Sequence, residues 1–334
     1  MSGLDLARRF YEQAVRPLLR DRPHAAALLG NGSEVLGHDD AVSTDHDFGP
    51  RVQLFLADET AVADAVALLR TVPGQVEMTT AEQFFTQRLG VDPLAGMRLV
   101  DWLVAATQIL ASLTAGAVFH DPYGALEGRR RVLRWYPEDI WRYALAAGWL
   151  RVGQEEAFVG RVGATGDDLG SRLVAARLTR ELVRLAFLVE RRWAPYSKWL
   201  GQAFAGLPLA ARLDPHLTAT MTASDWRERE AAVCAAASVL GEATNGLGLC
   251  EPVDPAPRQF HERDIRVVGA ERFTVALTEA ITDPDVRAVL ARLGYRRGTA
   301  VGMLPGTIDQ AVDSTDILCH PDRCRAAAAM LGCG

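Results

Sequence analysis

Two short features of the first hundred residues carry residue types that can do chemistry together. Gly32-Ser33 is a small, flexible pair, and Asp45 and Asp47 follow it with one residue between them. Aspartates so close together repel one another, so they favour a position beside a cation. Mg²⁺ takes oxygen ligands, and proteins hold it with one or two carboxylates together with phosphate oxygens. The pattern therefore indicates a site for Mg²⁺ and a nucleoside triphosphate.

These residue types are the ones that a nucleotide-transfer reaction would need. An acceptor attacks the α-phosphate while pyrophosphate leaves, and two metal ions can stabilise both oxygens. Side chains at alternate positions of a strand point the same way, so Asp45 and Asp47 can share one metal pair. Gly32 lets the backbone approach a phosphate, and the Ser33 hydroxyl can donate to it. A helix start expected at residues 34–36 would direct further N–H groups at the anion.

A third carboxylate is expected from a neighbouring strand. Glu77 lies in the short apolar run QVEM, where a charge has no evident structural task. We interpret it as a third metal ligand or a general base. Glu82 is the alternative, although its pattern is that of a helix surface. The plain structural interpretation of Glu77 is a carboxylate at the edge of a sheet.

The elements that must position these residues follow from periodicity and capping. Strands are expected at 25–29, 51–56 and 76–79, and helices at 58–69 and 80–89, which gives a small mixed sheet. Beyond residue 98 the pattern is mostly helical. The fold class is therefore α+β. Three parts are expected: a sheet domain at 1–100, a helical domain at 101–250, and a small helical segment with one strand at 258–334. A strand near 117–120 is a candidate to join the sheet of the first domain. The helices expected beyond residue 98 lie at 98–114, 137–149, 151–160, 168–193 and 223–240.

Composition restricts the class of protein. Charged residues make up 23 % of the 334 residues and the net charge is −6, which is unlike the basic face of a nucleic-acid binder. No window reaches the roughly 18 apolar residues that span a bilayer. We therefore expect a cytoplasmic protein that does not act at a membrane. Lys198 is the chain's one lysine, so its position in APYSKWLG draws attention.

The spacing of the first motif resembles a known signature. A Gly-Ser pair, eleven residues, and then Asp-x-Asp before an apolar strand is similar to the nucleotidyltransferase superfamily with the DNA polymerase β-like fold. More closely, GSEVLGHDDAVSTDHDFGPR, LTAGAVFHDPYGAL, RWYPEDIW and APYSKWLG in this order resemble a bacterial nucleotidyltransferase-like family that carries a domain of unknown function. The two-domain layout is similar to that of the aminoglycoside adenylyltransferases.

The resemblance implies a reaction and a set of site residues. The reaction is Mg²⁺-dependent transfer of a nucleoside monophosphate, AMP from ATP, to a small-molecule acceptor with release of pyrophosphate. Two Mg²⁺ ions and ATP as co-substrate are implied. Gly32, Ser33 and Lys198 would then contact the nucleotide. The metal ligands would be Asp45, Asp47 and Glu77.

The acceptor side is predicted from polar residues in an otherwise apolar region. Glu155, Arg161 and Asp168 lie in QEEAFVGR and GDDLGSR, and an acid such as Asp168 would suit a cationic acceptor. Their plain structural interpretation is helix ends and a glycine-rich loop.

Two other functions stay open at this point. One is a nucleotide-binding regulatory or toxin-like protein of the same fold with little catalysis. The presence of Asp45, Asp47 and Glu77 argues against it. The other is a transferase that acts on nucleic acid, against which the acidic balance speaks.

Overall fold

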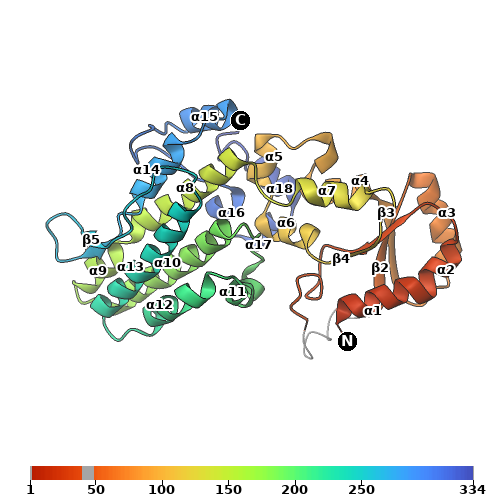
Figure 1. Ribbon diagram of the computed structural model, residues 1–334, viewed down its shortest axis with the longest axis horizontal. Coiled ribbons are helices and arrows are strands. Elements are labelled where there is room, and N and C mark those ends of the chain that lie inside the picture. Colours follow the sequence, from red (N-terminus) through yellow and green to blue (C-terminus); the bar gives the residue numbers. More distant parts are fainter. Residues whose placement is uncertain (1, 40–48, 334) are drawn as a thin grey trace. The chain divides into compact units, whose positions relative to one another are not determined.

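The chain forms two compact units in a computed structural model that describes residues 2–39 and 49–333 (Figure 1). Unit 1 comprises Met1–Trp135 and Ser314–Ala326, and unit 2 comprises Tyr136–Asp313 and Ala327–Gly334. The expected α+β class is confirmed, because unit 1 contains a small mixed sheet and unit 2 consists mostly of helices.

The sheet of unit 1 has the strand order β3-β2-β1-β4. β2 and β3 run parallel with Gln53 opposite Glu77, whereas β1 is antiparallel to both β2 and β4. The strand expected near residues 117–120 is therefore part of this sheet. The elements of unit 1 are α1 (Gly3–Phe10), a π-helical turn (Tyr11–Val15), α2 (Arg16–Leu19), β1 (Ala25–Leu28), β2 (Arg51–Leu56), α3 (Glu59–Leu69), β3 (Gln75–Thr80), α4 (Ala81–Leu89), a 3₁₀ turn (Pro93–Ala95), α5 (Leu99–Val104), α6 (Thr107–Thr114), β4 (Ala117–His120), α7 (Ala125–Val132), α17 (Thr315–Leu318) and α18 (Pro321–Ala326).

The two faces of β2 have different tasks. Val52, Leu54 and Leu56 point to one face, where they pack with the N-terminal helical segment and α3 in a buried apolar cluster. The alternate residues Gln53 and Phe55 point to the other face, where Phe55 meets Phe84 of α4 with ring centroids 5.1 Å apart. The polar site described below therefore lies on the α4 face of the sheet.

The unit boundaries differ from the sequence-based division at residue 100. Residues 101–135 belong to the unit that contains the sheet, because β4 pairs with β1. The C-terminal stretch is shared between both units. Its residues 314–326 belong to unit 1, where Arg325 donates to the fully buried carboxylate of Asp101 at 2.8 Å.

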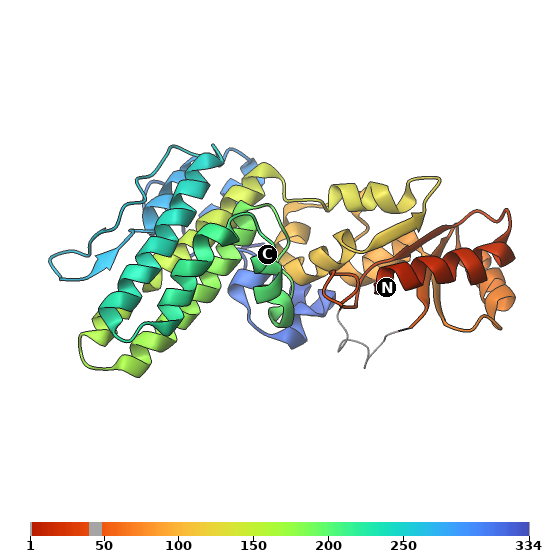
Figure 2. The same ribbon diagram turned by 60° about the horizontal axis from the view of Figure 1, so that its bottom comes forward.

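Unit 2 is built around long helices that pack side by side (Figure 2). No helix within the described ranges of the chain has both the length and the apolar character needed to cross a membrane. The elements of unit 2 are α8 (Glu138–Glu155), α9 (Phe158–Gly163), α10 (Asp168–Val189), α11 (Ser197–Ala205), α12 (Ala210–Thr222), α13 (Trp226–Gly246), β5 (Arg258–Gln259), β6 (Arg266–Val267), α14 (Glu271–Glu279), α15 (Pro284–Arg292) and α16 (Ile308–Ala311).

Three helix boundaries differ from the sequence-based ones. The helix expected over 98–114 is divided into α5 and α6 by extended backbone at Ala105 and Ala106. The helix expected to end before residue 150 continues as α8 to Glu155. The sequence predicts that the helix over 223–240 closes on Gly241, but Gly241 does not end α13. It lies inside the helix, where an added Cβ would be 2.7 Å from both Phe273 Cζ and Pro255 Cβ. This glycine allows close packing and does not cap the helix.

This packing predicts opposite effects for two glycine substitutions. Gly241→Ala should lower the free energy of unfolding by about 1–3 kcal/mol, because the methyl group has no space beside Phe273. Gly201→Ala, in the interior of α11 with no atom within 4 Å of its added Cβ, should raise it by roughly 0.5–1 kcal/mol. Urea unfolding of both variants measures the two values. Equal effects would show that Gly241 is not tightly packed.

Candidate functional site

The turn after β1 brings Gly32-Ser33 to the end of the sheet. The Gly30 N–H donates to the Ser112 carbonyl at 2.9 Å, and the His38 N–H donates to the Ser33 carbonyl at 2.8 Å. Residues 33–37 form turns and not the helix start that the sequence predicted. Gly37 has a φ of +74°, which bends the chain away after a single turn.

An ion pair crosses this turn beside Gly32. Arg51, the first residue of β2, donates from Nε to Glu34 Oε1 at 2.8 Å and from Nη2 to the Asn31 carbonyl at 2.5 Å. Both side chains are largely buried, with 16 % and 11 % of their surfaces exposed. A Cβ on Gly32 would lie 2.1 Å from Arg51 Nη2, and its φ of +132° disfavours any other residue. Glycine is therefore required here, and a guanidinium group lies beside the Gly-Ser pair.

Gln53 holds the end of β1 against β2. Its carboxamide accepts from the Leu29 N–H at 2.8 Å and donates to the Leu29 carbonyl at 2.9 Å, as a strand backbone would. The same Nε2 lies 3.1 Å from Glu77 Oε2. Sequence analysis missed this residue. A signal was present, because Gln53 is the one uncharged polar residue in the strand RVQLFL.

Glu77 lies opposite Gln53 on the edge strand β3, and its side chain is 46 % exposed. Arg88 of α4 lies 3.5 Å from its carboxylate, with the guanidinium 3.6 Å from the centre of the Phe84 ring. Burial against this ring lowers the pKa of Arg88. The same guanidinium lies next to Gly30. The structure thus links Glu77 to Leu29 through Gln53 and to Gly30 through Arg88, just before Gly32-Ser33.

The two aspartates of the motif, Asp45 and Asp47, lie outside the described residues. Their roles as metal ligands therefore stay predictions. Within the described part of the chain, no group of three His, Cys, Asp or Glu side chains is placed to hold a metal ion.

Lys198 belongs to unit 2, at the start of α11. Its side chain is exposed, and its Nζ lies 4.6 Å from the centre of the Trp199 ring. Trp199 is buried and donates from its indole N–H to the Tyr196 hydroxyl at 2.7 Å. The aromatic pair thus supports the helix start, and the ammonium group faces solvent.

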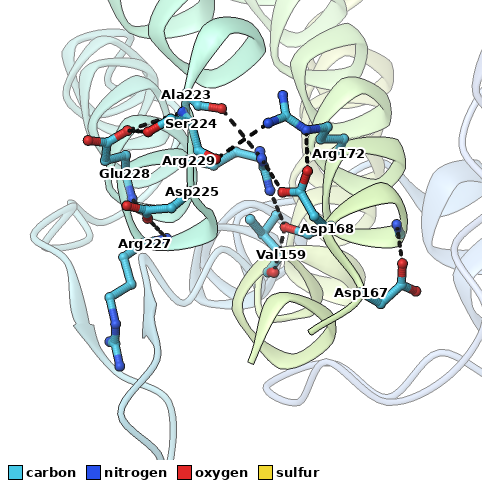
Figure 3. Close-up of polar contacts among 12 residues, drawn as sticks. Val159, Asp167, Asp168, Arg172, Ala223, Ser224, Asp225, Arg227, Glu228 and Arg229 are labelled. Carbon is cyan, nitrogen blue, oxygen red and sulfur yellow. Dashed lines mark hydrogen bonds and ion pairs between the residues drawn. The ribbon is translucent and has the colours of Figure 1, made fainter. Parts of the chain in front are cut away.

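Asp168 links two long helices (Figure 3). Its carboxylate accepts from Arg172 Nε at 2.7 Å and from Arg229 Nη2 at 2.9 Å. Arg172 and Arg229 lower the pKa of Asp168. Arg229 is completely buried and also donates to Ser171 Oγ at 2.6 Å, whose hydroxyl donates in turn to the Val159 carbonyl. Asp168 therefore has a structural partner in Arg229 of α13.

The three residues predicted to bind an acceptor have separate partners. Arg161 stacks on Phe158, with its guanidinium 5.3 Å from the ring centre. Glu155 pairs with Arg177 at 3.2 Å. Arg177 lies nine residues after Asp168, which is about 13 Å along α10. The structure does not unite Glu155 and Asp168 in one cluster.

Comparisons with known proteins give limited information. A family model described as a domain of unknown function (DUF4037) matches residues 102–200, which is less than a third of the chain. A crystal structure of a nucleotidyltransferase-like protein from Exiguobacterium sibiricum 255-15 is 13 % identical, with a TM-score of 0.34 over 87 % of this chain and 91 % of that one. A TM-score this low supports no conclusion about fold or function. No curated protein shows significant similarity to the chain.

The contacts of Gln53 predict a structural effect that is separate from any chemistry. Gln53→Leu should lower the free energy of unfolding by about 2–4 kcal/mol, because the buried N–H and C=O of Leu29 would lose their partners. Gln75→Leu on the exposed start of β3 should change it by less than about 0.5 kcal/mol. Chemical denaturation compares the two. If both variants unfold like the wild type, the carboxamide does not hold β1 in place.

Proposed function

We propose that the protein is a nucleotidyltransferase that moves a nucleoside monophosphate from a nucleoside triphosphate to a small-molecule acceptor. The observation that carries this proposal is that Gln53 contacts both Glu77 and Leu29, the residue just before the turn that contains Gly32-Ser33. In the sequence, Asp45 and Asp47 come between these two elements, a few residues before Arg51. This order of glycine-serine turn, paired acids and third acid is similar to the nucleotidyltransferase signature, and the three acids are of the type that the reaction's metal ions need.

The residues of unit 1 fit an anion beside a cation. In the turn after β1, Asn31 is exposed and Gly32 and Ser33 are partly exposed, and the guanidinium of Arg51, paired with Glu34, lies next to them. Glu77 is half-exposed and within reach of Gln53 and Arg88, which hold its carboxylate in place. Bound Mg²⁺ would supply charge stabilisation for the attacking and leaving oxygens, with Asp45, Asp47 and Glu77 as its protein ligands. The chain's own contribution is to position the triphosphate and to accept the acceptor's proton at a carboxylate such as Glu77.

The choice of AMP and ATP is part of the proposal. It rests on the resemblance to adenylyltransferases in the sequence. A pyrophosphate-release assay with the four ribonucleoside triphosphates and pooled small-molecule acceptors tests it directly. Nucleotide binding without pyrophosphate release from any pool would favour the regulatory alternative.

The paired aspartates give the strictest test of the metal role. Asp45→Asn and Asp47→Asn should each abolish Mg²⁺-dependent pyrophosphate release, because each removes a charged ligand. They should leave the melting temperature unchanged or raised, since like charges without metal repel. Asp21→Asn, at an exposed aspartate elsewhere in unit 1, is the control and should behave like the wild type. Mg²⁺-dependent ATP binding equal to that of the wild type in both variants would refute the assignment.

Glu77 should separate turnover from binding. Glu77→Gln should keep ATP affinity within a few-fold and lower turnover by about a hundredfold or more if the carboxylate is a general base. Glu82→Gln, a nearby exposed carboxylate on α4, should behave like the wild type. Steady-state kinetics alongside ATP titration gives both values. Wild-type turnover in Glu77→Gln would transfer the role to another acid.

Lys198 is proposed as a triphosphate contact, as the sequence resemblance implies. Lys198→Ala should weaken ATP binding by roughly ten- to a hundredfold at low salt, because a charged hydrogen bond is lost. Lys198→Arg should restore part of the affinity. If Lys198 only packs over the Trp199 ring, Lys198→Ala should lower the melting temperature and leave the ATP affinity unchanged. Calorimetric titration with melting curves distinguishes the two.

A further inference from the structure

Unit 2 contains a pocket of about 480 Å³ that is unrelated to the motif residues of unit 1. Two helices, α8 and α10, and the segment 309–313 surround it, so every wall comes from the same unit. Its volume is in the range of small-molecule sites. The lining residues include four arginines: Arg151, Arg177, Arg180 and Arg184.

Three of these arginines form a row on one face of α10. Arg177, Arg180 and Arg184 are three and four residues apart, so their side chains emerge one turn above another. A long helix with buried neighbours on its other faces holds the row rigidly, since Leu178, Leu182 and Leu185 are buried. The row presents several guanidinium groups to one pocket.

Arg151 differs from the row because its donors are already used. It binds Glu181 with both Nε and Nη2, at 2.9 and 3.0 Å, and donates from Nη1 to the Gln310 carbonyl at 2.7 Å. Only 8 % of the Glu181 side chain is exposed. This contact is a fixed part of the wall, and it attaches the segment 309–313 to α8 and α10.

Arg180 and Arg184 share a carboxylate that faces solvent. Arg180 binds both oxygens of Asp313 with its two terminal nitrogens, one of them at 2.7 Å. Arg184 Nη2 lies 3.8 Å from the same carboxylate and donates from Nη1 to the Asp309 carbonyl at 2.9 Å. The hydrogen bond from Arg180 lowers the pKa of Asp313. Asp313 is nevertheless 62 % exposed, so an anion from solution can reach and replace it.

We propose that this pocket binds a small phosphorylated molecule, with its phosphate at the position that the Asp313 carboxylate occupies between Arg180 and Arg184. A guanidinium group binds phosphate and carboxylate with the same forked geometry. A phosphate monoester carries about −1.5 to −2 charges near neutral pH, against −1 for the aspartate, so two arginines favour it. Arg177 is 59 % exposed and pairs with Glu155, which lies outside the pocket lining, and it adds positive charge farther along the row.

The experiment titrates inorganic phosphate into the full chain by calorimetry in a chloride buffer of low ionic strength. The wild type should bind phosphate saturably. Arg180→Gln and Arg184→Gln should each weaken binding at least about tenfold, because each removes a charged hydrogen bond. Asp313→Asn should strengthen it by about threefold to tenfold, because the competing carboxylate is removed. The control is Arg172→Gln on the same helix, whose partner Asp168 lies outside the pocket lining, and it should bind like the wild type.

The higher phosphate affinity expected of Asp313→Asn is the decisive result. If the Arg180–Asp313 ion pair were purely structural, Asp313→Asn would only lower the melting temperature. Arg180→Lys covers the case in which Arg180→Gln does not fold, and it should bind phosphate with intermediate affinity. No saturable binding by either the wild type or Asp313→Asn overturns the proposal, and so does an equal loss in Arg172→Gln. Because this titration contains no Mg²⁺ and is read from the Arg180, Arg184 and Asp313 variants, and the nucleotide site is tested by Mg²⁺-dependent pyrophosphate release, the two proposals fail or succeed separately.

Discussion

The candidate site in unit 1 depends on one side-chain amide. Gln53 satisfies both backbone polar groups of Leu29, which lies just past the end of β1 and has no strand partner of its own there. A buried peptide group without partners costs about 2–4 kcal/mol, so this contact stabilises the start of the turn at Leu29 by a similar amount. Because the same amide reaches Glu77, the position of the turn and the position of the carboxylate are set together. Any chemistry that needs both groups relies on this shared contact.

Nearly all the basic side chains of the chain are arginines, because Lys198 is its one lysine. Arginine suits this role because its planar fork can bind two acceptors at once and keeps its charge when buried. Arg51 uses that fork to join Glu34 to the Asn31 carbonyl, and Arg229 joins Asp168 to Ser171. Each guanidinium thus connects elements that are distant in sequence. Replacement by lysine would keep the charge and lose one of the two connections.

Local sequence signals located the strands well and the side-chain contacts poorly. β1, β2 and β3 begin and end within one residue of the expected ranges, because their apolar runs are bounded by glycine, proline and capping residues. The partners of Glu77 were missed, since Gln53 and Arg88 meet it only after two strands and a helix have packed. Gly241 was misinterpreted as a helix end, because a glycine required for close packing and one that caps a helix look the same in a single sequence. The acceptor residues were grouped by their closeness in sequence, but Glu155 contacts Arg177, which lies about two and a half turns of α10 beyond Asp168.

The two proposed anion sites share a physical arrangement, and it sets how each would respond to a ligand. Beside Gly32 the guanidinium of Arg51 holds Glu34, and in unit 2 the guanidinium of Arg180 holds Asp313. The difference lies in solvent access, because Glu34 is 11 % exposed and Asp313 is 62 % exposed. A carboxylate that is buried and also bonded to a fixed turn costs far more to displace than one that faces water. At the proposed nucleotide site Arg51 is therefore a fixed part of the turn whose charge stays paired with Glu34. Arg180 can exchange its partner, so affinity in the pocket of unit 2 would be set by competition between the ligand and the chain's own aspartate.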